Sequence, residues 1–216
     1  MDETTQMRER DWGDLQFLPD LYIKYGRHVI AVAIVLLTVF IAVALYRANI
    51  TRNRLEASAA LLTARTQEDM KALVSNYPSS SSAAIAALRL AKLHYDLGDY
   101  ELALGMYVEF MEQYPRHDMF AIAELGRIHC LEARLQTEEA LQGFIAFIES
   151  RPKHFLVPQA ILGQARCLEQ MGKYTDAKVV YEDFIASYSD SGWLSTAEEK
   201  LSVINEILEE TEASTK

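Results

Sequence analysis

Histidine and cysteine have the widest chemical use among the side chains of this sequence, and their spacing matches no catalytic or metal-binding motif. The five histidines form no H-E-x-x-H pair, and the two cysteines form no C-x-x-C pair. A G-x-S-x-G nucleophile elbow and a glycine-rich phosphate loop are also absent from the sequence. We therefore expect a protein that is not an enzyme and that uses no cofactor and no metal ion.

The two cysteines, Cys130 and Cys167, are too few for a disulfide scaffold. Both fall in helix-like segments of successive repeats, where stacked helices stand roughly 8–10 Å apart, beyond the reach of a disulfide. We expect two buried thiols that pack as small apolar side chains.

The segment from Ala84 to Pro115 predicts two amphipathic helices joined by a tight turn. Apolar residues recur every three or four positions on both sides of the Gly98-Asp99-Tyr100 break. We expect Gly98 to end the first helix in the left-handed conformation, Asp99 to cap the second, and Pro115 to stop it.

This helical hairpin repeats along the chain with a period of 37 residues. The shift 140 − 103 = 37 relates Ala103, Tyr107, Phe110 and Pro115 to Ala140, Phe144, Phe147 and Pro152, and a further 37 gives Ala177, Tyr181 and Phe184. In the second unit the first helix aligns better at a shift of 35, because Lys92-Leu93-His94 then matches Arg127-Ile128-His129. We therefore expect the turn from Ala133 to Thr137, which lacks glycine, to be about two residues longer than the others.

These residues resemble the tetratricopeptide repeat (TPR) family. The resemblance lies in Leu90, Ala91, Ala103, Tyr107 and Pro115 and in the Gly-Asp-Tyr turn. It implies an all-α fold, a TPR-like α-solenoid of three to four helical hairpins with a C-terminal capping helix. Met70, Leu73 and Pro78 lie 37 residues before Tyr107, Phe110 and Pro115 and indicate a degenerate leading repeat.

An apolar run from Val29 to Leu45 predicts a single transmembrane helix in front of the solenoid. It contains no charged residue, spans roughly 26 Å as a helix, and is bracketed by basic residues and tyrosines. The predicted organisation is a polar N-terminal segment (1–27), the transmembrane helix (28–47), the leading repeat (48–82), three repeats (83–191), a capping helix (192–210) and a frayed tail (211–216).

Charge is unevenly distributed between the two parts of the chain. Residues 1–54 carry 7 Lys/Arg and 6 Asp/Glu, a net charge of +1, whereas residues 55–216 carry 14 and 25, a net charge of −11. Such an acidic domain argues against nucleic acid as a partner. The basic residues on the two sides of the apolar run are nearly balanced, so charge does not set the membrane orientation.

The family resemblance implies that the first helix of each hairpin lines a groove for a protein or peptide partner. The candidate groove residues are Ile85, Leu88, Lys92, Tyr95, Arg127, Leu162 and Arg166, with Arg127 placed by the shift of 35, which also selects Phe120, Ala123 and Cys130. Lys92, Arg127 and Arg166 would form a basic column able to bind carboxylates. Alternatively, these three cations form ordinary pairs within their own helices, with Asp96, Glu124 and Glu169 respectively.

The whole plan is similar to the YfgM-like family of ancillary SecYEG translocon subunits, which have a short polar start, a Tyr-Gly-Arg entry, one membrane helix and degenerate repeats. The resemblance implies a scaffold in the bacterial inner membrane with its repeat domain in the periplasm, where translocon, chaperones or exported chains are its partners. Two alternatives are a coordinator of outer-membrane or cell-wall assembly and a cytosol-facing import or docking receptor.

Overall fold

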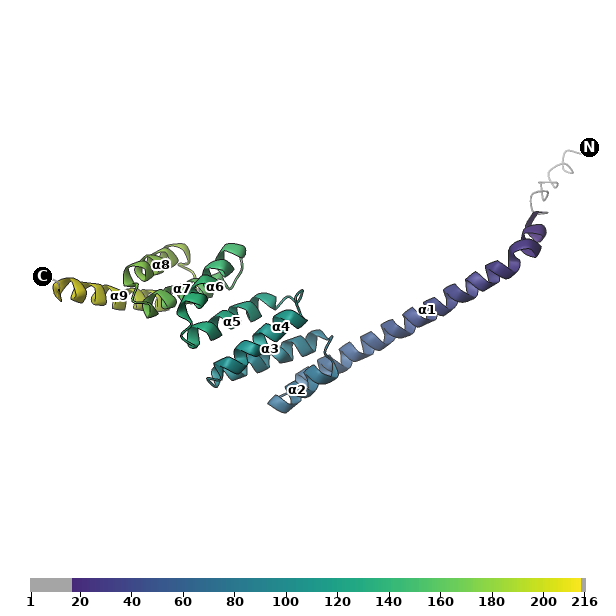
Figure 1. The fold of residues 1–216 in the computed structure, drawn as a ribbon, viewed down its shortest axis with the longest axis horizontal. Helices are drawn as coiled ribbons and strands as arrows, with labels where there is room; N and C mark the ends of the chain where they lie inside the picture. Colours follow the sequence, from purple (N-terminus) through teal and green to yellow (C-terminus); the bar gives the residue numbers. More distant parts are fainter. Residues whose placement is uncertain (1–16, 215–216) are drawn as a thin grey trace, which may run out of the picture. The chain divides into compact units, whose positions relative to one another are not determined.

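The computed structural model describes residues 17–214, and all regular structure within this range is helical. The predicted polar segment at residues 1–27 lies outside the described residues up to residue 16, as do residues 215–216 of the predicted tail. The described part contains nine helices (Figure 1). The chain divides into two compact units, Met1–Leu55 and Glu56–Lys216.

The first unit contains most of helix α1 (Phe17–Thr63), which includes the predicted membrane segment. From Ile30 onward α1 is long and apolar enough to cross a membrane, and large apolar side chains from Ile30 to Leu45 are exposed to solvent. A soluble core helix would bury such side chains against its own protein. In composition and exposure, α1 therefore fits a membrane anchor or a signal segment.

The second unit is a row of antiparallel helix pairs that follow one another along the chain (Figure 1). The end of α1 and α2 (Gln67–Asn76) come first, and α9 (Leu194–Ser214) comes last, packed on α8. Between them lie three complete hairpins: α3 (Ser81–Asp96) with α4 (Tyr100–Gln113), α5 (Phe120–Ala133) with α6 (Thr137–Ser150), and α7 (Val157–Gln170) with α8 (Tyr174–Ser187).

All three hairpin turns have the same length, so the prediction of a longer second turn was wrong. Three residues separate the paired helices in every hairpin, and the middle one is left-handed each time: Gly98, Leu135 and Gly172, with φ of 85°, 60° and 71°. Leu135 adopts a backbone conformation that costs a residue with a Cβ roughly 1–2 kcal/mol. Leucine thus stands in the place of glycine at the second turn without any change in turn length, and the shift of 37 holds from α3 to α8.

The repeated apolar residues form the core. Ala103, Ala140 and Ala177 are fully buried where the helices of each hairpin touch, and the aromatic residues four and seven positions later are at least 95% buried. Small residues at the contact let two helix backbones approach closely, and the rings fill the space beside it. The sequence pattern that predicted the hairpins is thus the pattern of the core.

Glycines on the first helices make room for these aromatic rings. A Cβ built on Gly126 would lie 2.5 Å from the ring of Tyr107, and one built on Gly163 would lie 2.4 Å from the ring of Phe144. Both pairs join a helix to the preceding hairpin and are related by the shift of 37. Glycine is required here by contact, because real carbon atoms do not approach so closely.

At the junctions before α3, α5, α7 and α9, a side chain at one repeated position accepts a hydrogen bond from a backbone N–H two or three residues later. Ser80 Oγ accepts from the backbone N–H of Ala83, and His117 Nδ1 accepts from the N–H of Met119. His154 and Ser191, at further shifts of 37, accept from Leu156 and Trp193. Each bond satisfies a donor near the start of the next helix.

Two local predictions have different outcomes. Asp99 does not cap α4 with its side chain, because its Oδ2 atom lies 3.3 Å from His94 Nδ1 instead. Cys130 and Cys167 are free and fully buried, as expected, and burial raises the pKa of each thiol to about 12.

Candidate peptide-binding groove

The first helices of the three hairpins, α3, α5 and α7, together line two neighbouring pockets. The central pocket, of about 390 Å³, lies along α3, α5 and α7 and is lined by Lys92, Tyr95, Tyr107, Ile122, Leu125, Gly126, His129, Leu156, Gln159 and Arg166. The N-terminal pocket, of about 610 Å³, lies along α2, α3 and α5 and is lined by Arg65, Met70, Ile85, Leu88, Arg89, Lys92, Leu93, Asp96, Tyr107, Met119 and Ile122. They share Lys92, Tyr107 and Ile122, so they form one groove.

Five of the seven residues predicted for the groove lie in it. Ile85 and Leu88 line the N-terminal pocket, Tyr95 and Arg166 line the central pocket, and Lys92 lines both. The first helices therefore place these residues on one face, as the period of the repeat requires.

The other two predicted residues, Leu162 and Arg127, line neither pocket. Leu162 is only 4% exposed and packs in the core of the last two hairpins. Arg127 was placed by the shift of 35, which also selected Ala123 and Cys130, and these two residues are fully buried. With the observed shift of 37, His129 takes the position assigned to Arg127.

Three residues of α5 that line the central pocket were not predicted from the sequence. Ile122, Leu125 and His129 follow Ile85, Leu88 and Lys92 at a shift of 37. The signal was present in the sequence, since the same shift relates the second helices and also Lys92, His129 and Arg166. The local likeness of Arg127-Ile128-His129 to Lys92-Leu93-His94 obscured it.

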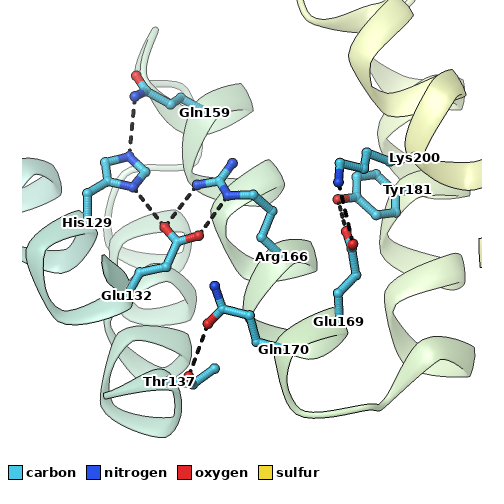
Figure 2. A network of polar contacts seen from close by, with 9 residues as sticks. All are labelled: His129, Glu132, Thr137, Gln159, Arg166, Glu169, Gln170, Tyr181 and Lys200. Atoms are coloured by element: carbon cyan, nitrogen blue, oxygen red, sulfur yellow. Dashed lines mark hydrogen bonds and ion pairs between the residues drawn. The ribbon is translucent and has the colours of Figure 1, made fainter. Parts of the chain in front are cut away.

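A buried carboxylate holds together two residues that line the central pocket, His129 and Arg166 (Figure 2). Glu132, which is 6% exposed, accepts hydrogen bonds of 2.7 and 2.9 Å from Arg166 Nε and Nη2, and its Oε2 lies 3.1 Å from His129 Nδ1. Gln159 Nε2 lies 3.2 Å from the other ring nitrogen of His129. Residues from α5 and α7 are thereby tied together across the junction.

The ionisation of this pair follows from its contacts. Burial alone would raise the pKa of Glu132, but hydrogen bonds from His129 and Arg166 and their charges outweigh it and hold the pKa below its ordinary value. For Arg166, burial acts to lower the pKa, and the Glu132 carboxylate raises it overall. Both groups are charged at neutral pH, so much of the Arg166 charge is already compensated by the protein itself.

The other cations of the predicted basic column have different partners. Lys92 pairs with Asp96 at 2.7 Å, which agrees with the alternative prediction of pairs within one helix. Arg166 pairs with Glu132 and not with Glu169, and the Glu124 carboxylate pairs with Arg151 at 2.7 Å rather than with Arg127. The structure therefore assembles no continuous column of free cations at Lys92, Arg127 and Arg166.

A second polar cluster joins α7, α8 and α9 (Figure 2). The Tyr181 hydroxyl donates to Glu169 Oε1 at 2.5 Å, and Lys200 Nζ lies 3.7 Å from Glu169 Oε2. Burial and the Glu169 carboxylate raise the pKa of Tyr181. Thr137 donates to Gln170 at 3.1 Å, which links α6 to the end of α7.

The hydroxyl of Tyr107 differs from that of Tyr181, its equivalent two repeats later. Tyr107 contributes to the lining of both pockets, and its hydroxyl makes no hydrogen bond to any of residues 17–214. Burial is the main cause that raises its pKa, so the group remains a neutral donor and acceptor. The groove thus has an unpartnered polar group among apolar side chains, a composition suited to an extended or helical peptide.

The described residues contain no group of three His, Cys, Asp or Glu side chains that could hold a metal ion. The groove residues offer charge, hydrogen bonds and apolar surface, which are means of recognising a protein or peptide.

A row of helical hairpins with a concave groove defines the class of α-solenoid interaction proteins. Residues 20–206 match the model of the tetratricopeptide repeat-like domain, and the chain belongs to this family. Comparison with curated proteins gave no match.

Two solved structures have a similar fold. One is a crystal structure of nearly identical TPR-like repeats from a Podosopora anserina protein described as a kinesin light chain, with 12% identity and a TM-score of 0.55, covering 77% of this chain and 90% of that chain. The other is a point variant of the same repeats, with 14% identity and a TM-score of 0.53, covering 76% and 93%. At this level of identity the likeness concerns the fold alone. Repeat domains of this kind typically act as non-enzymatic scaffolds that bind other proteins.

Proposed function

We propose that this chain is a membrane-anchored TPR scaffold of the bacterial cell envelope, which assists exported proteins or their chaperones at the translocon. The observation that carries the proposal is the presence, in one chain, of an exposed apolar helix long enough to cross a membrane and of a TPR groove. In this proposal α1 is the single anchor in the inner membrane and the repeat domain lies in the periplasm. The similarity of the overall plan to YfgM-like translocon subunits supports the choice of partner.

The groove suits a role in holding other chains. Its two pockets run along successive first helices, so a bound segment several residues long contacts more than one hairpin. Recognition then comes from a series of apolar and polar contacts, and no rearrangement of the fold is needed. This is the behaviour expected of a scaffold for partially extended clients.

The first test is the membrane topology of the full chain expressed in a bacterium. Spheroplasts are treated with protease, and the fragment carrying residues 56–216 is followed. We expect digestion as soon as the outer layer is opened, because the proposal places the repeat domain in the periplasm. Protection until the inner membrane is lysed would contradict it and would favour a cytosol-facing docking receptor.

The second test identifies the partners by photocrosslinking. A crosslinking amino acid is placed at Lys92, whose side chain is 67% exposed and lines both pockets. The control position is Val179 on α8, which is exposed and lines neither pocket. We expect crosslinks to translocon subunits, chaperones or exported chains from position 92 only. Crosslinks to outer-membrane or cell-wall assembly proteins instead would favour that alternative.

A further inference from the structure

The junction between α2 and α3 differs from the two junctions that follow it. At the later junctions a glycine, Gly126 or Gly163, lies against the ring of the preceding hairpin. Thirty-seven residues before Gly126 the chain has Arg89, and 37 before Tyr107 it has Met70. The first junction therefore has a cation in place of the glycine and a flexible thioether in place of the ring, and here the N-terminal pocket forms.

Two guanidinium groups in this pocket lack a counter-ion within the protein. Arg89 and Arg65 are exposed, both line the N-terminal pocket, and neither forms an ion pair with any residue from 17 to 214. The third cation, Lys92, pairs with Asp96, which is the only acidic residue in the lining. The lining has a formal charge of 3 − 1 = +2, within a unit whose 14 basic and 25 acidic residues give −11.

The rest of the lining is apolar, with one polar exception. Methionine, leucine and isoleucine side chains supply most of it, and the unpartnered hydroxyl of Tyr107 is shared with the central pocket. Methionine adapts its shape to different apolar partners. The pocket thus combines an adaptable apolar floor, a free hydroxyl and two free guanidinium groups.

We propose that the N-terminal pocket binds an acidic, amphipathic segment of a partner protein. Carboxylates of this segment pair with Arg89 and Arg65, its apolar side chains fill the pocket, and one of its polar groups meets the Tyr107 hydroxyl. The proposal rests on the scaffold function above and specifies its partner by chemistry. It assigns carboxylate recognition to the N-terminal pocket and not to the central pocket, because Arg166 of the central pocket is already paired with Glu132.

A peptide fits these features better than an anionic lipid surface. The groups lie in a concave pocket of about 610 Å³ rather than on a flat basic face. The net charge of −11 on the unit opposes approach to an anionic membrane, whereas a short segment meets only the local positive field.

The test uses the purified full-length chain in detergent micelles and an array of short synthetic peptides. The peptides vary in their content of Asp/Glu and of Leu/Phe, and each has a twin with Asn/Gln in place of Asp/Glu. We expect the strongest binding from peptides that are both acidic and apolar, loss of binding in their amide twins, and weakening at high salt.

Variants assign this binding to the pocket. Arg89→Glu should weaken the affinity for the best peptide about tenfold or more, because a charge-assisted pair is replaced by repulsion. Both Arg and Glu are good helix formers, so the exposed site on α3 tolerates the change. The matched control is Arg116→Glu, an exposed arginine outside both pockets, which should leave the affinity unchanged.

Several outcomes would overturn the proposal. They are equal binding of neutral or basic peptides, equal effects of the two variants, and binding of a soluble short-chain phosphatidylglycerol when none of the peptides binds. The last result would assign the pocket to a lipid headgroup. Persistence of the Lys92 crosslinks to export partners in the Arg89→Glu variant would leave the scaffold function standing while this inference fails.

Discussion

Arg166 on α7 reaches across the hairpin junction and donates two hydrogen bonds to the carboxylate of Glu132 on α5. This pair (Figure 2) is the main polar link between the second and third hairpins, and its arginine lines the central pocket. Arg166 and Glu132 therefore affect both the charge of the central pocket and the packing of the third hairpin on the second.

Replacing Arg166 should destabilise the solenoid far more than replacing Lys92. Arg166→Met leaves Glu132 buried with His129 alone, and we expect a loss of about 2–3 kcal/mol in the free energy of unfolding. Lys92→Met removes an exposed pair within one helix and should cost less than about 0.5 kcal/mol. Urea unfolding of the full chain in micelles measures both, and equal losses would contradict the assigned role of Glu132.

The Glu132 carboxylate should make stability depend on acidic pH. Its pKa in the folded protein is lower than the ordinary value of 4.5, so the unfolded chain takes up this proton first as the pH falls. The stabilisation is complete above about pH 4.5 and is lost as the pH falls through the folded pKa. In the Glu132→Gln variant, the free energy of unfolding should therefore decrease less steeply below this pH than in the parent chain. Urea titrations at several pH values measure this slope. An unchanged slope would show that other carboxylates carry the acid response.

The left-handed turn at Leu135 offers a stabilising substitution. Leu135 has φ of 60° and a side chain that is 77% exposed, so Leu135→Gly relieves backbone strain and sacrifices little packing. We expect a gain of about 0.5–1 kcal/mol, after the greater flexibility of glycine in the unfolded chain is subtracted. Gly98→Ala and Gly172→Ala should lose about 1 kcal/mol each, and a Leu135→Gly variant that is less stable than the parent would refute the strain argument.

The contact between Gly163 and Phe144 predicts a large effect from a single methyl group. Gly163→Ala places a carbon atom 2.4 Å from the buried ring, and we expect a loss of about 1–3 kcal/mol from the forced shift. Gly105→Ala is the control, because nothing lies within 4 Å of the added carbon on α4. In a helix interior that change should stabilise by about 0.5–1 kcal/mol. The midpoint temperature of thermal unfolding should therefore fall for Gly163→Ala and rise for Gly105→Ala, relative to the parent chain.

The helices and the core could be read from the sequence because they depend on residue types that recur at a fixed interval. Ala103, Tyr107 and Phe110 predicted the buried contacts of all three hairpins, and the structure confirms them. The second turn could not be predicted in the same way, since nothing in the local sequence marks Leu135 as a residue that adopts a conformation typical of glycine. The missing glycine agreed with the local likeness of Arg127-Ile128-His129 to Lys92-Leu93-His94, and together they led to the wrong alignment of α5 and to the choice of Arg127 over His129.

The polar contacts of the groove were harder to predict than its position. Pairs within one helix follow from a spacing of three or four residues, and the Lys92–Asp96 pair was among the alternatives. The Arg166–Glu132 pair joins residues 34 apart, and its existence depends on how two hairpins stack. Charge at a sequence position therefore indicates a cation or an anion, while only the stacked structure shows whether it is free to bind.

The constant interval of 37 residues makes the middle hairpin interchangeable with its neighbours. Residues 120–156 form one full period, and their removal would join Met119 to Val157 with every helix still facing its proper partner type. Tyr107 would then meet Gly163, in the same relationship that it now has with Gly126. The groove would become shorter by one hairpin without a change in its design, so duplication or loss of a single period offers a route by which such a protein adjusts its reach to the length of its client.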